Sequence, residues 1–176
     1  MSSTLNEFRT HLDAAQRSAV HLEMRDSYAV GDEAEDFANW KATGVRDVDP
    51  DTVNWKPWVS TVAETISRGI VMRRARIVST PVSQYIAFEH AGTPVNVGAG
   101  EQVRWLARRD ASGIALPASD LWIFDETTVM FNHFDGTGDW AESPLEVTRD
   151  PAVVELCRTA FEAVWARATP HDEFVI

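Results

Sequence analysis

Two histidine–carboxylate pairs come closest, by residue type and spacing, to acid–base or metal chemistry. His21 stands two residues before Glu23, and His133 stands two residues before Asp135. Residues two apart on a strand point to the same face, so each pair could share a proton or bind a metal ion. The spacing is common, however, and neither pair has a third ligand that can be named. We therefore interpret both histidines as hydrogen-bonded side chains of a sheet, and we expect no metal and no cofactor.

The residues that could act as nucleophiles lack activating neighbours. Cys157, the single cysteine, falls on the apolar stripe of an expected helix, where we expect a buried and unreactive thiol. No serine stands in a G-x-S-x-G turn, and the chain has neither a P-loop nor a complete G-x-G-x-x-G. These absences favour a protein that is not an enzyme, and no catalytic residue is predicted.

Arginine is concentrated in the middle of the chain. The 176 residues include 16 Lys+Arg and 27 Asp+Glu, which gives a formal net charge of −11. Residues 69–109 hold six arginines and two glutamates, a balance of +4, whereas residues 1–68 sum to −5 and residues 110–176 sum to −10. A guanidinium group is a planar fork that fits carboxylates and phosphates, so these arginines could line a pocket for an anionic ligand.

Two interpretations of these arginines stay open. The first is a phosphate- or carboxylate-binding pocket on the sheet, with the predicted members Arg74, Arg76, Tyr85, Glu23, Arg25, Arg104 and Asp125. The second, which we favour, is a layer of ion pairs, for which the available carboxylates are Glu23, Glu89, Asp120 and Asp125. Arginines around an open cavity would support the pocket, and buried arginines that each meet a carboxylate would support the ion-pair layer. Asp125 has a further interpretation, as an ordinary turn residue.

Tryptophan is abundant, with seven in the chain. Trp105 and Trp122 lie in expected strands and are assigned to the core. Trp55 and Trp58 lie around Pro57, at the end of an expected loop. They could line a ligand cleft or a protein interface, where aromatic anchors are common, or they could pin the loop to the core.

Hydrophobic periodicity predicts an α/β (α+β) fold in one domain that spans residues 1–176. The expected helices cover 4–17, 31–42, 57–67, 82–90 and the residues after Asp150. The expected strands cover 19–26, 70–79, 102–109, 121–125 and 128–134, and the last two form a hairpin. The intervening segments 43–57 and 92–100 are expected to be a loop and a turn-rich stretch. This order predicts a single mixed β-sheet of about five strands with helices packed on it, and a C-terminal hairpin followed by a helix.

Composition excludes several classes of protein. A net charge of −11 argues against a general nucleic-acid coat and against binding to an anionic membrane surface. No apolar run is long enough to cross a membrane, and the first residues lack the apolar core of a signal peptide. A single cysteine excludes an internal disulfide. We therefore expect a cytoplasmic protein with no membrane partner and no direct nucleic-acid partner.

Five segments together carry a resemblance to a known family. They are HLEMRDSY (21–28), RRARIVSTPVSQY (73–85), GEQVRWLARR (100–109), LPASDLWIFD (116–125) and the closing helix with Trp165. They resemble an uncharacterised actinobacterial family, a domain of unknown function whose members are often encoded beside helix-turn-helix regulators. The resemblance spans nearly the whole chain and implies a genomic context rather than a mechanism.

The order of elements also resembles one half of a phospholipase-D-like domain, in which a hairpin carries the catalytic H-x-K motif. This chain departs from that pattern, because its two lysines, Lys41 and Lys56, do not follow a histidine at that spacing. The resemblance therefore implies a relative that lacks the covalent phosphohistidine chemistry and serves in ligand sensing or protein binding.

Two classes of function follow from these observations. The leading hypothesis is a non-catalytic accessory or regulatory protein that binds a protein partner, expected to be a basic helix-turn-helix transcriptional regulator, through its acidic ends and exposed aromatic residues. The alternative is a small-molecule or nucleotide (anion) binding domain, or an enzyme, with an arginine-lined pocket on the sheet. Direct DNA binding by this chain is disfavoured, because no expected helix carries a basic face.

Overall fold

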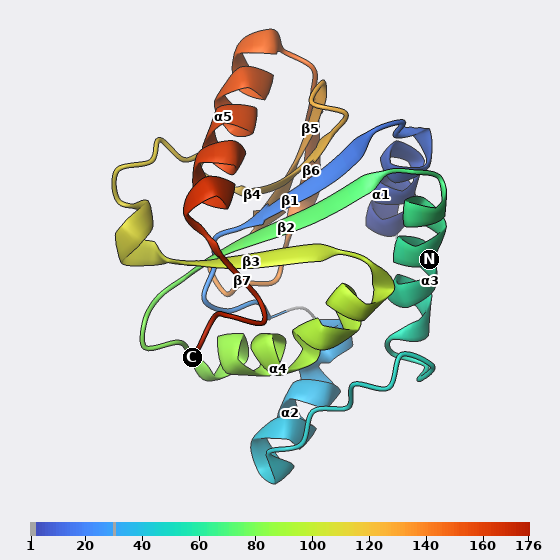
Figure 1. Cartoon of the computed structure of the whole chain (residues 1–176), viewed down its shortest axis with the longest axis vertical. Coiled ribbons are helices and arrows are strands. Elements are labelled where there is room, and N and C mark those ends of the chain that lie inside the picture. The colour runs from blue at the N-terminus through green and yellow to red at the C-terminus, as the bar shows by residue number, and fades with distance from the viewer. Residues whose placement is uncertain (1–2, 30) are drawn as a thin grey trace.

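A seven-stranded mixed β-sheet forms the centre of this computed structural model, which describes residues 3–29 and 31–176 (Figure 1). The strands are β1 (Ser18–Glu23), β2 (Val71–Val78), β3 (Gln102–Ala107), β4 (Asp120–Phe124), β5 (Thr128–Phe134), β6 (Trp140–Thr148) and β7 (Thr169–Pro170). They lie in the order β6-β5-β4-β1-β2-β3-β7. The central strands β1, β2 and β3 are parallel, and the other neighbours are antiparallel. The mixed α/β class is confirmed, but the expected number of about five strands is wrong.

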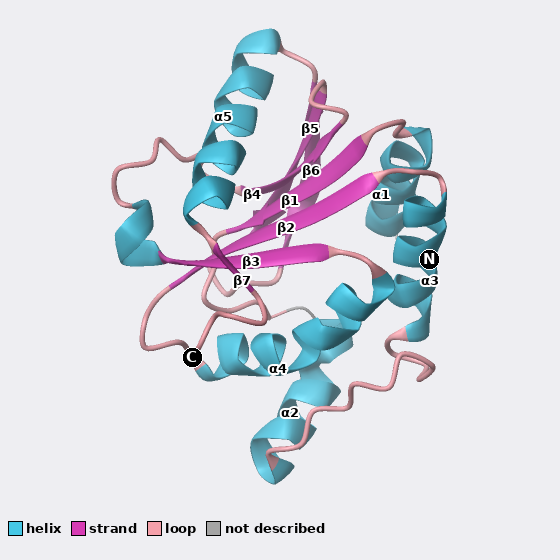
Figure 2. Ribbon diagram, viewed as in Figure 1, coloured by secondary structure: helices cyan, strands magenta, loops and turns pink. Residues whose placement is uncertain are grey.

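Helices surround this sheet (Figure 2). Within the described residues the α-helices are α1 (Ser3–Ala14), α2 (Ala34–Thr43), α3 (Lys56–Ser67), α4 (Gln84–Ala99) and α5 (Pro151–Arg167), and the short 3-10 helices are η1 (Gly31–Glu33) and η2 (Arg108–Ala111). Among these helices, none combines the length and the apolar character that crossing a membrane requires. The expected domain, 1–176, includes residues 1, 2 and 30, which lie outside the described residues.

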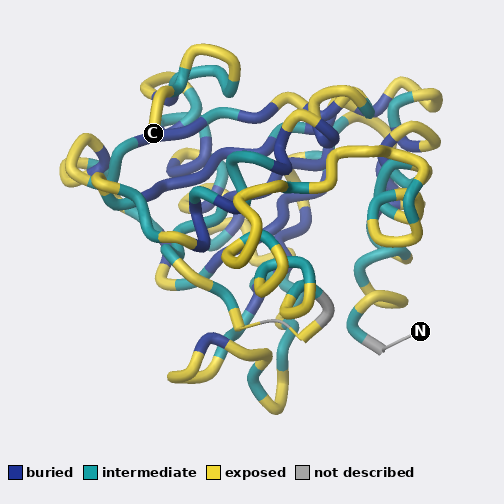
Figure 3. The backbone as a smooth tube through the Cα atoms, turned by 90° about the horizontal axis from the view of Figure 1, so that it is seen from below, coloured by how far each residue is buried: buried dark blue, intermediate teal, exposed yellow. Residues whose placement is uncertain are grey.

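The two faces of the sheet are covered by different helices. On one face, α5 buries Cys157 and Phe161 against β1, β2 and β4. On the other face, α1 and α3 pack over β1, β4 and β5, and α4 packs beside them over β2 and β3. The most buried residues follow the central strands, and the exposed residues lie on the segments around them (Figure 3). Because side chains alternate along a strand, Ala75 faces α5 whereas Arg74 and Arg76 face the side of α3 and α4.

Helix α4 is longer than expected, because the turn-rich stretch 92–100 is helical as far as Ala99. Ser83 caps the helix by accepting a hydrogen bond from the backbone N–H of Ile86 at 3.0 Å. Pro94 removes one backbone donor inside the helix, yet the buried side chains around it hold the helix against the sheet. Gly100 then ends the helix with a left-handed φ of 110°. Tertiary packing therefore overrides the local glycine and proline content.

The sequence interpretation missed strands β6 and β7, so the predicted hairpin is followed by a further strand before the last helix. Strand β6 contains Pro144, and a proline argues against a central strand but is tolerated at a sheet edge. Strand β7 has two residues, which is too short for a periodic pattern. Both strands lie at the edges of the sheet and are defined by pairing with a neighbour rather than by alternating burial.

The hairpin of β4 and β5 is confirmed, and its turn contains Asp125. Asp125 and Glu126 have φ values of 52° and 61°, the positive values that a type I′ turn requires. The Asp125 carboxylate accepts hydrogen bonds from the backbone N–H groups of Gln16 at 2.9 Å and Arg17 at 2.7 Å. These contacts match the interpretation of Asp125 as a turn residue, and they place it at the start of β1.

Helix α2 and the loop 44–55 form an outer layer on α4. The Arg46 guanidinium lies 3.9 Å from the centroid of the Phe88 ring and pairs with Asp36 at 3.1 Å. Gly92 of α4 leaves the room for this contact, since a Cβ there would lie 3.0 Å from Arg46 Nε and 3.1 Å from the Trp55 ring. Because Gly92 has no side chain, Arg46 and Trp55 of the outer layer can pack directly against helix α4.

Candidate functional site

A layer of buried ion pairs lies between the sheet and helices α3 and α4. Arg74 donates from Nε to Glu101 at 2.8 Å and from Nη1 to Glu23. Arg76 pairs through Nε with Glu23 at 2.5 Å and through Nη2 with Glu89 at 2.7 Å. Only 8% of Arg74 and 6% of Arg76 is exposed. The carboxylates thus meet both guanidinium groups, although Arg76 Nη1 is buried without a hydrogen-bond partner, and the geometry matches the ion-pair interpretation.

Strand register and one helix bring this layer together. The parallel pairing of β1 and β2 sets Glu23 beside Arg76, and the R-A-R sequence of β2 points Arg74 to the same face. Glu89 comes from α4, and Glu101 comes from the turn between α4 and β3. Four elements distant in sequence therefore contribute to one charge cluster. Two of its members, Glu89 and Glu101, lie outside the predicted pocket.

The cluster sets the protonation of the His21–Glu23 pair. Burial alone would raise the pKa of Glu23, but Arg76 and Arg74 outweigh it and lower that pKa to about 2. Burial lowers the pKa of His21 to about 3, so the imidazole is neutral near pH 7. The ring stacks on Trp122 with centroids 4.1 Å apart, and its Nδ1 lies 3.3 Å from Glu23 Oε1. Neither ring nitrogen makes a hydrogen bond within the described residues, so the expected hydrogen-bonded histidine is wrong at His21. Throughout 3–29 and 31–176, no three His, Cys, Asp or Glu residues gather where they could hold a metal ion.

Two tyrosine–carboxyl pairs lie beside the ion-pair layer. Tyr28 donates to Asp120, and Tyr85 donates to Glu33 at 2.5 Å. Burial raises the pKa of Asp120 to about 6, and burial together with the negative charge of Glu89 raises the pKa of Glu33 to about 7. Asp120 is a candidate partner for an arginine in the sequence, but in the structure its carboxylate accepts hydrogen bonds from the Tyr28 hydroxyl and from the backbone N–H of Met24. Tyr28 and Glu33 were not candidates, because nothing local marks them.

Arg104 lies on the opposite face of the sheet from Arg74 and Arg76. The register of β2 and β3 sets Arg104 beside Ala75, whose side chain faces α5. Its guanidinium lies 4.5 Å from the centroid of the Trp165 ring and donates to the Trp165 backbone oxygen at 3.1 Å. Grouping Arg104 with Arg74 and Arg76 in one pocket is therefore wrong, because a one-residue difference in register exchanges the two faces.

The other predicted site residues are also dispersed. Arg25 lies 5.2 Å from the centroid of the Phe134 ring, at the end of β5. Asp125 lies at the other end of β1, in the hairpin turn. Only Glu23, Arg74, Arg76 and Tyr85 of the predicted pocket are brought together. Whether any of these residues binds a ligand stays a prediction.

The two candidate interface tryptophans are turned toward the protein. Trp55 donates from Nε1 to the backbone oxygen of Asp47 at 2.9 Å. The Trp58 ring lies 6.3 Å from those of Phe8 and Trp122, in the core beneath α1 and α3. These contacts match the interpretation in which the tryptophans pin the loop.

The candidate nucleophiles occupy ordinary structural positions. Cys157 lies on α5 and is buried against the sheet as expected, and burial raises the pKa of its thiol to about 11. Ser119 Oγ lies 3.4 Å from His133 Nδ1, and His133 Nε2 lies 3.1 Å from Glu146, in place of the expected Asp135. The Glu146 side chain of this string is 63% exposed, so solvent screens the carboxylate that would have to orient the histidine.

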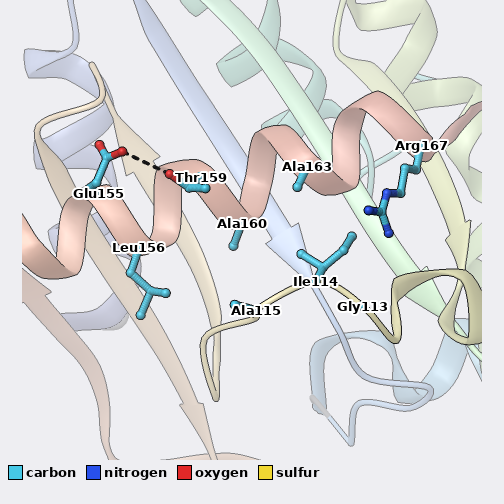
Figure 4. Close-up of a pocket in the computed structure, with 9 residues that line it drawn as sticks. All are labelled: Gly113, Ile114, Ala115, Glu155, Leu156, Thr159, Ala160, Ala163 and Arg167. Atoms are coloured by element: carbon cyan, nitrogen blue, oxygen red, sulfur yellow. Dashed lines mark hydrogen bonds between the residues drawn. The ribbon is translucent and has the colours of Figure 1, made fainter.

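Two cavities lie beside the sheet, and the second borders the ion-pair layer only through Glu101. The first, of about 310 Å³, is a groove between α5 and residues 113–115, with Leu156, Ala160 and Ile114 along it (Figure 4). Glu155, the acidic residue that lines this groove, accepts a hydrogen bond from the Thr159 hydroxyl at 3.1 Å. The second, of about 430 Å³, lies where the end of α4, the start of β3 and residues 170–172 meet. Neither cavity is lined by Arg74 or Arg76.

Six exposed acidic residues lie on and around β5 and β6. We name as the acidic hairpin surface the exposed carboxylates Glu126, Asp135, Asp139, Glu142, Glu146 and Asp150. Residues 126–150 contain only one basic residue besides His133, Arg149, and so carry a balance of −5. Trp140, at the start of edge strand β6, is 37% exposed and stacks on Phe134 with centroids 4.5 Å apart. The acidic charge is therefore presented outward beside an aromatic ring.

Two known structures match most of this chain. TrmBL2, an archaeal chromatin protein described as showing a novel mode of DNA binding, matches with a TM-score of 0.50 and 15% identity, over 94% of this chain and 50% of that chain. This chain thus spans about half the length of TrmBL2, and the likeness concerns the fold alone. Nuc, a phospholipase D family member from Salmonella typhimurium, matches with a TM-score of 0.49 and 11% identity, over 92% of this chain and 86% of that chain.

Sequence comparison identifies the family. No curated protein matches the chain. The sequence profile of one family, described as "Domain of unknown function (DUF6879)", matches residues 6–176. That match covers nearly the whole chain and agrees with an uncharacterised domain that extends from α1 to the C-terminal segment. The chain belongs to the DUF6879 family of domains of unknown function.

Proposed function

We propose that this chain is a non-catalytic accessory or regulatory protein that binds a basic protein partner through its acidic hairpin surface. The separation of charge between interior and surface carries this proposal. Arg74 and Arg76 are buried among carboxylates, whereas the six carboxylates of the acidic hairpin surface are exposed. An exposed surface of one sign speeds association with an oppositely charged partner and selects against partners of like charge.

Strand β6 supplies the other features of a docking edge. It is an edge strand, so one row of its backbone groups lies outside the sheet ladder. Trp140 offers an exposed ring beside the acidic residues Asp139 and Glu142. An aromatic anchor within a polar rim is a frequent arrangement at protein interfaces.

The partner that fits this surface is a basic DNA-binding regulator. The family resemblance implies an actinobacterial context in which members are encoded beside helix-turn-helix regulators, and such regulators carry basic faces. DNA itself fits less well, although TrmBL2 of the same fold is described as binding DNA, because six exposed carboxylates repel phosphates.

The contacts of the candidate nucleophiles support the non-catalytic part of the proposal. A thiolate is the reactive form of cysteine, and burial of Cys157 raises its pKa and disfavours that form. The Ser119–His133–Glu146 string ends in an exposed carboxylate, whereas catalytic triads depend on a water-excluded acid.

Charge reversal tests the proposal against a matched control. The hairpin variant carries Glu142→Lys and Glu146→Lys, and the control carries Glu7→Lys and Asp13→Lys on α1, where both residues are exposed. Both variants change the net charge by the same amount, so overall charge cannot explain a difference. Titration with the regulator encoded beside the gene, at low salt, should show roughly tenfold weaker binding of the hairpin variant and nearly unchanged binding of the control. Absence of a complex, or equal losses in both variants, would contradict the proposal.

A further inference from the structure

The groove between α5 and residues 113–115 has apolar walls. Leu156 and Ala160 point from the helix toward that segment, and Ile114 points back toward the helix (Figure 4). Leu156 is 46% exposed, whereas Ala160 is 2% exposed. A single exposed leucine is ordinary on a protein surface, but this one borders a hollow of about 310 Å³. Apolar surface is therefore available to a ligand along the groove.

Small side chains keep the groove open. Helix α5 has alanine at positions 160 and 163, which lie on the same side of the helix because they are three residues apart. The facing segment contributes Gly113 and Ala115. A larger side chain at position 163 would extend into this space, which provides a variant that fills the groove.

The carboxylates of α5 are compensated by arginines. Arg158 donates to both oxygens of Glu155, at 2.9 Å and 3.2 Å. Arg73 of β2 pairs with the other glutamate of the helix, Glu162, at 2.6 Å. Glu155 also points away from residues 113–115, on the side of Thr159 (Figure 4). Neither carboxylate therefore presents an uncompensated negative charge to the groove.

Arg167 leaves one positive charge at the end of the groove. It lies in the last turn of α5, with its guanidinium on the side of residues 113–115 (Figure 4). Its Nη1 donates to the backbone oxygen of Asp110 at 3.3 Å. In the part of the chain that the structure describes, no carboxylate lies at ion-pair distance from Arg167. An apolar groove thus ends at a cation whose other N–H donors face solvent.

We propose that this groove is a binding site for a small amphipathic carboxylic acid. Its apolar chain would lie between Leu156 and Ile114, and its carboxylate would accept hydrogen bonds from the Arg167 fork. Eleven residues separate Leu156 from Arg167, about 16 Å along the helix, so an acid with a chain of medium length fits.

The size of the groove favours a free small molecule as the occupant. A volume of about 310 Å³ lies at the lower end of the range for small-molecule sites, and it is too small for a stable protein interface. The groove shares no residue with the acidic hairpin surface, so this site does not depend on the proposed function. It places an anion at Arg167 of α5 instead of at Arg74 and Arg76.

Titration calorimetry with hexanoate and octanoate, at constant ionic strength and below micelle formation, tests the site. The wild-type protein should bind octanoate saturably at millimolar concentration. Hexanoate should bind roughly fivefold more weakly, because two fewer methylene groups leave water. Arg167→Gln should weaken both acids roughly tenfold and leave their ratio unchanged, because the charge-assisted fork is lost and the apolar walls remain. Ala163→Leu should weaken octanoate more than hexanoate, because the added side chain shortens the groove.

Arg68→Gln is the matched control. Arg68 is likewise an exposed arginine at the end of a helix, and it donates to the backbone oxygens of Leu12 and Asp13. It lies at the end of α3, on the other face of the sheet, and its substitution changes the net charge by the same amount. The control should keep the wild-type affinity for octanoate within about twofold.

Four results would overturn the proposal. They are no saturable binding of octanoate to the wild-type protein, equal affinities for hexanoate and octanoate, full affinity in Ala163→Leu, and equal losses in Arg167→Gln and Arg68→Gln. Circular dichroism establishes that each variant is folded. If Ala163→Leu is not folded, Leu156→Gln replaces it, because Leu156 is half exposed and its substitution removes one apolar wall.

Discussion

Replacing Arg74 with methionine should destabilise the fold strongly, because it leaves buried carboxylates without their cation. Glu101 is 2% exposed and would keep Asn96 as its remaining side-chain partner, while Glu23 would keep Arg76. Removing one member of a buried ion pair costs about 3–5 kcal/mol, since the charge that remains is desolvated and unpaired. Equilibrium unfolding in urea, followed by tryptophan fluorescence, should therefore show a lower midpoint with an unchanged m-value.

A second substitution separates this cause from a loss of packing. In the double variant Arg74→Met with Glu101→Gln, the charge of residue 101 is removed and the amide can still contact Asn96. The double variant should recover roughly half or more of the lost stability, because neutral groups of similar shape replace a charged pair at little cost. A loss below about 1 kcal/mol for Arg74→Met alone would refute the ion-pair layer and favour an open arginine pocket.

Three further predictions concern other parts of the fold. Gly92→Ala should lower the free energy of unfolding by about 1–3 kcal/mol, because the new Cβ would lie 3.0 Å from the Arg46 side chain and 3.1 Å from Trp55. The control Gly98→Ala adds a Cβ with nothing within 4 Å and should stabilise the same helix slightly. Thermal unfolding of the two variants tests this difference. The pKa of the Glu33 carboxyl is raised to about 7, so its contribution to the free energy of unfolding is full below about pH 4.5 and is lost as the pH rises through 7. The wild-type protein should therefore lose about 2 kcal/mol of unfolding free energy relative to Glu33→Gln between pH 5 and pH 8, measured by urea unfolding. Parallel pH profiles of the two proteins would contradict this. Cys157 should react with a thiol reagent only after unfolding, and rapid labelling of the native protein would show that the thiol is accessible.

Local patterns were sufficient to predict the elements that form the middle of the sheet. Alternation in residues 19–26 and apolar runs in residues 70–79, 121–125 and 128–134 predict strands, and the structure has strands at each, with most of their residues buried. The pairing of Arg74 and Arg76 with carboxylates was the favoured interpretation, because buried charges need partners. The edge strand β6 was missed because Pro144 interrupts its pattern.

The site could be predicted only in part, because its contacts depend on register and on distant residues. The face that Arg104 occupies follows from the pairing of β2 with β3, which no local pattern contains. Tyr28 meets Asp120 across 92 residues, and Tyr85 meets Glu33 across 52 residues. Gly92 appears in the sequence as a helix breaker, yet its role is to admit the Arg46 side chain. Such contacts are properties of the tertiary structure.

Hydrogen–deuterium exchange on the complex tests the central proposal most directly, because it locates the partner without a substitution. The protein would be measured alone and saturated with the proposed partner, a basic helix-turn-helix regulator. Binding at the acidic hairpin surface predicts slower exchange in residues 126–150, where edge strand β6 and the turn before it lie, and unchanged exchange in α1. Protection confined to α1, α3 or the loop 44–55, with residues 126–150 unaffected, would contradict the proposal.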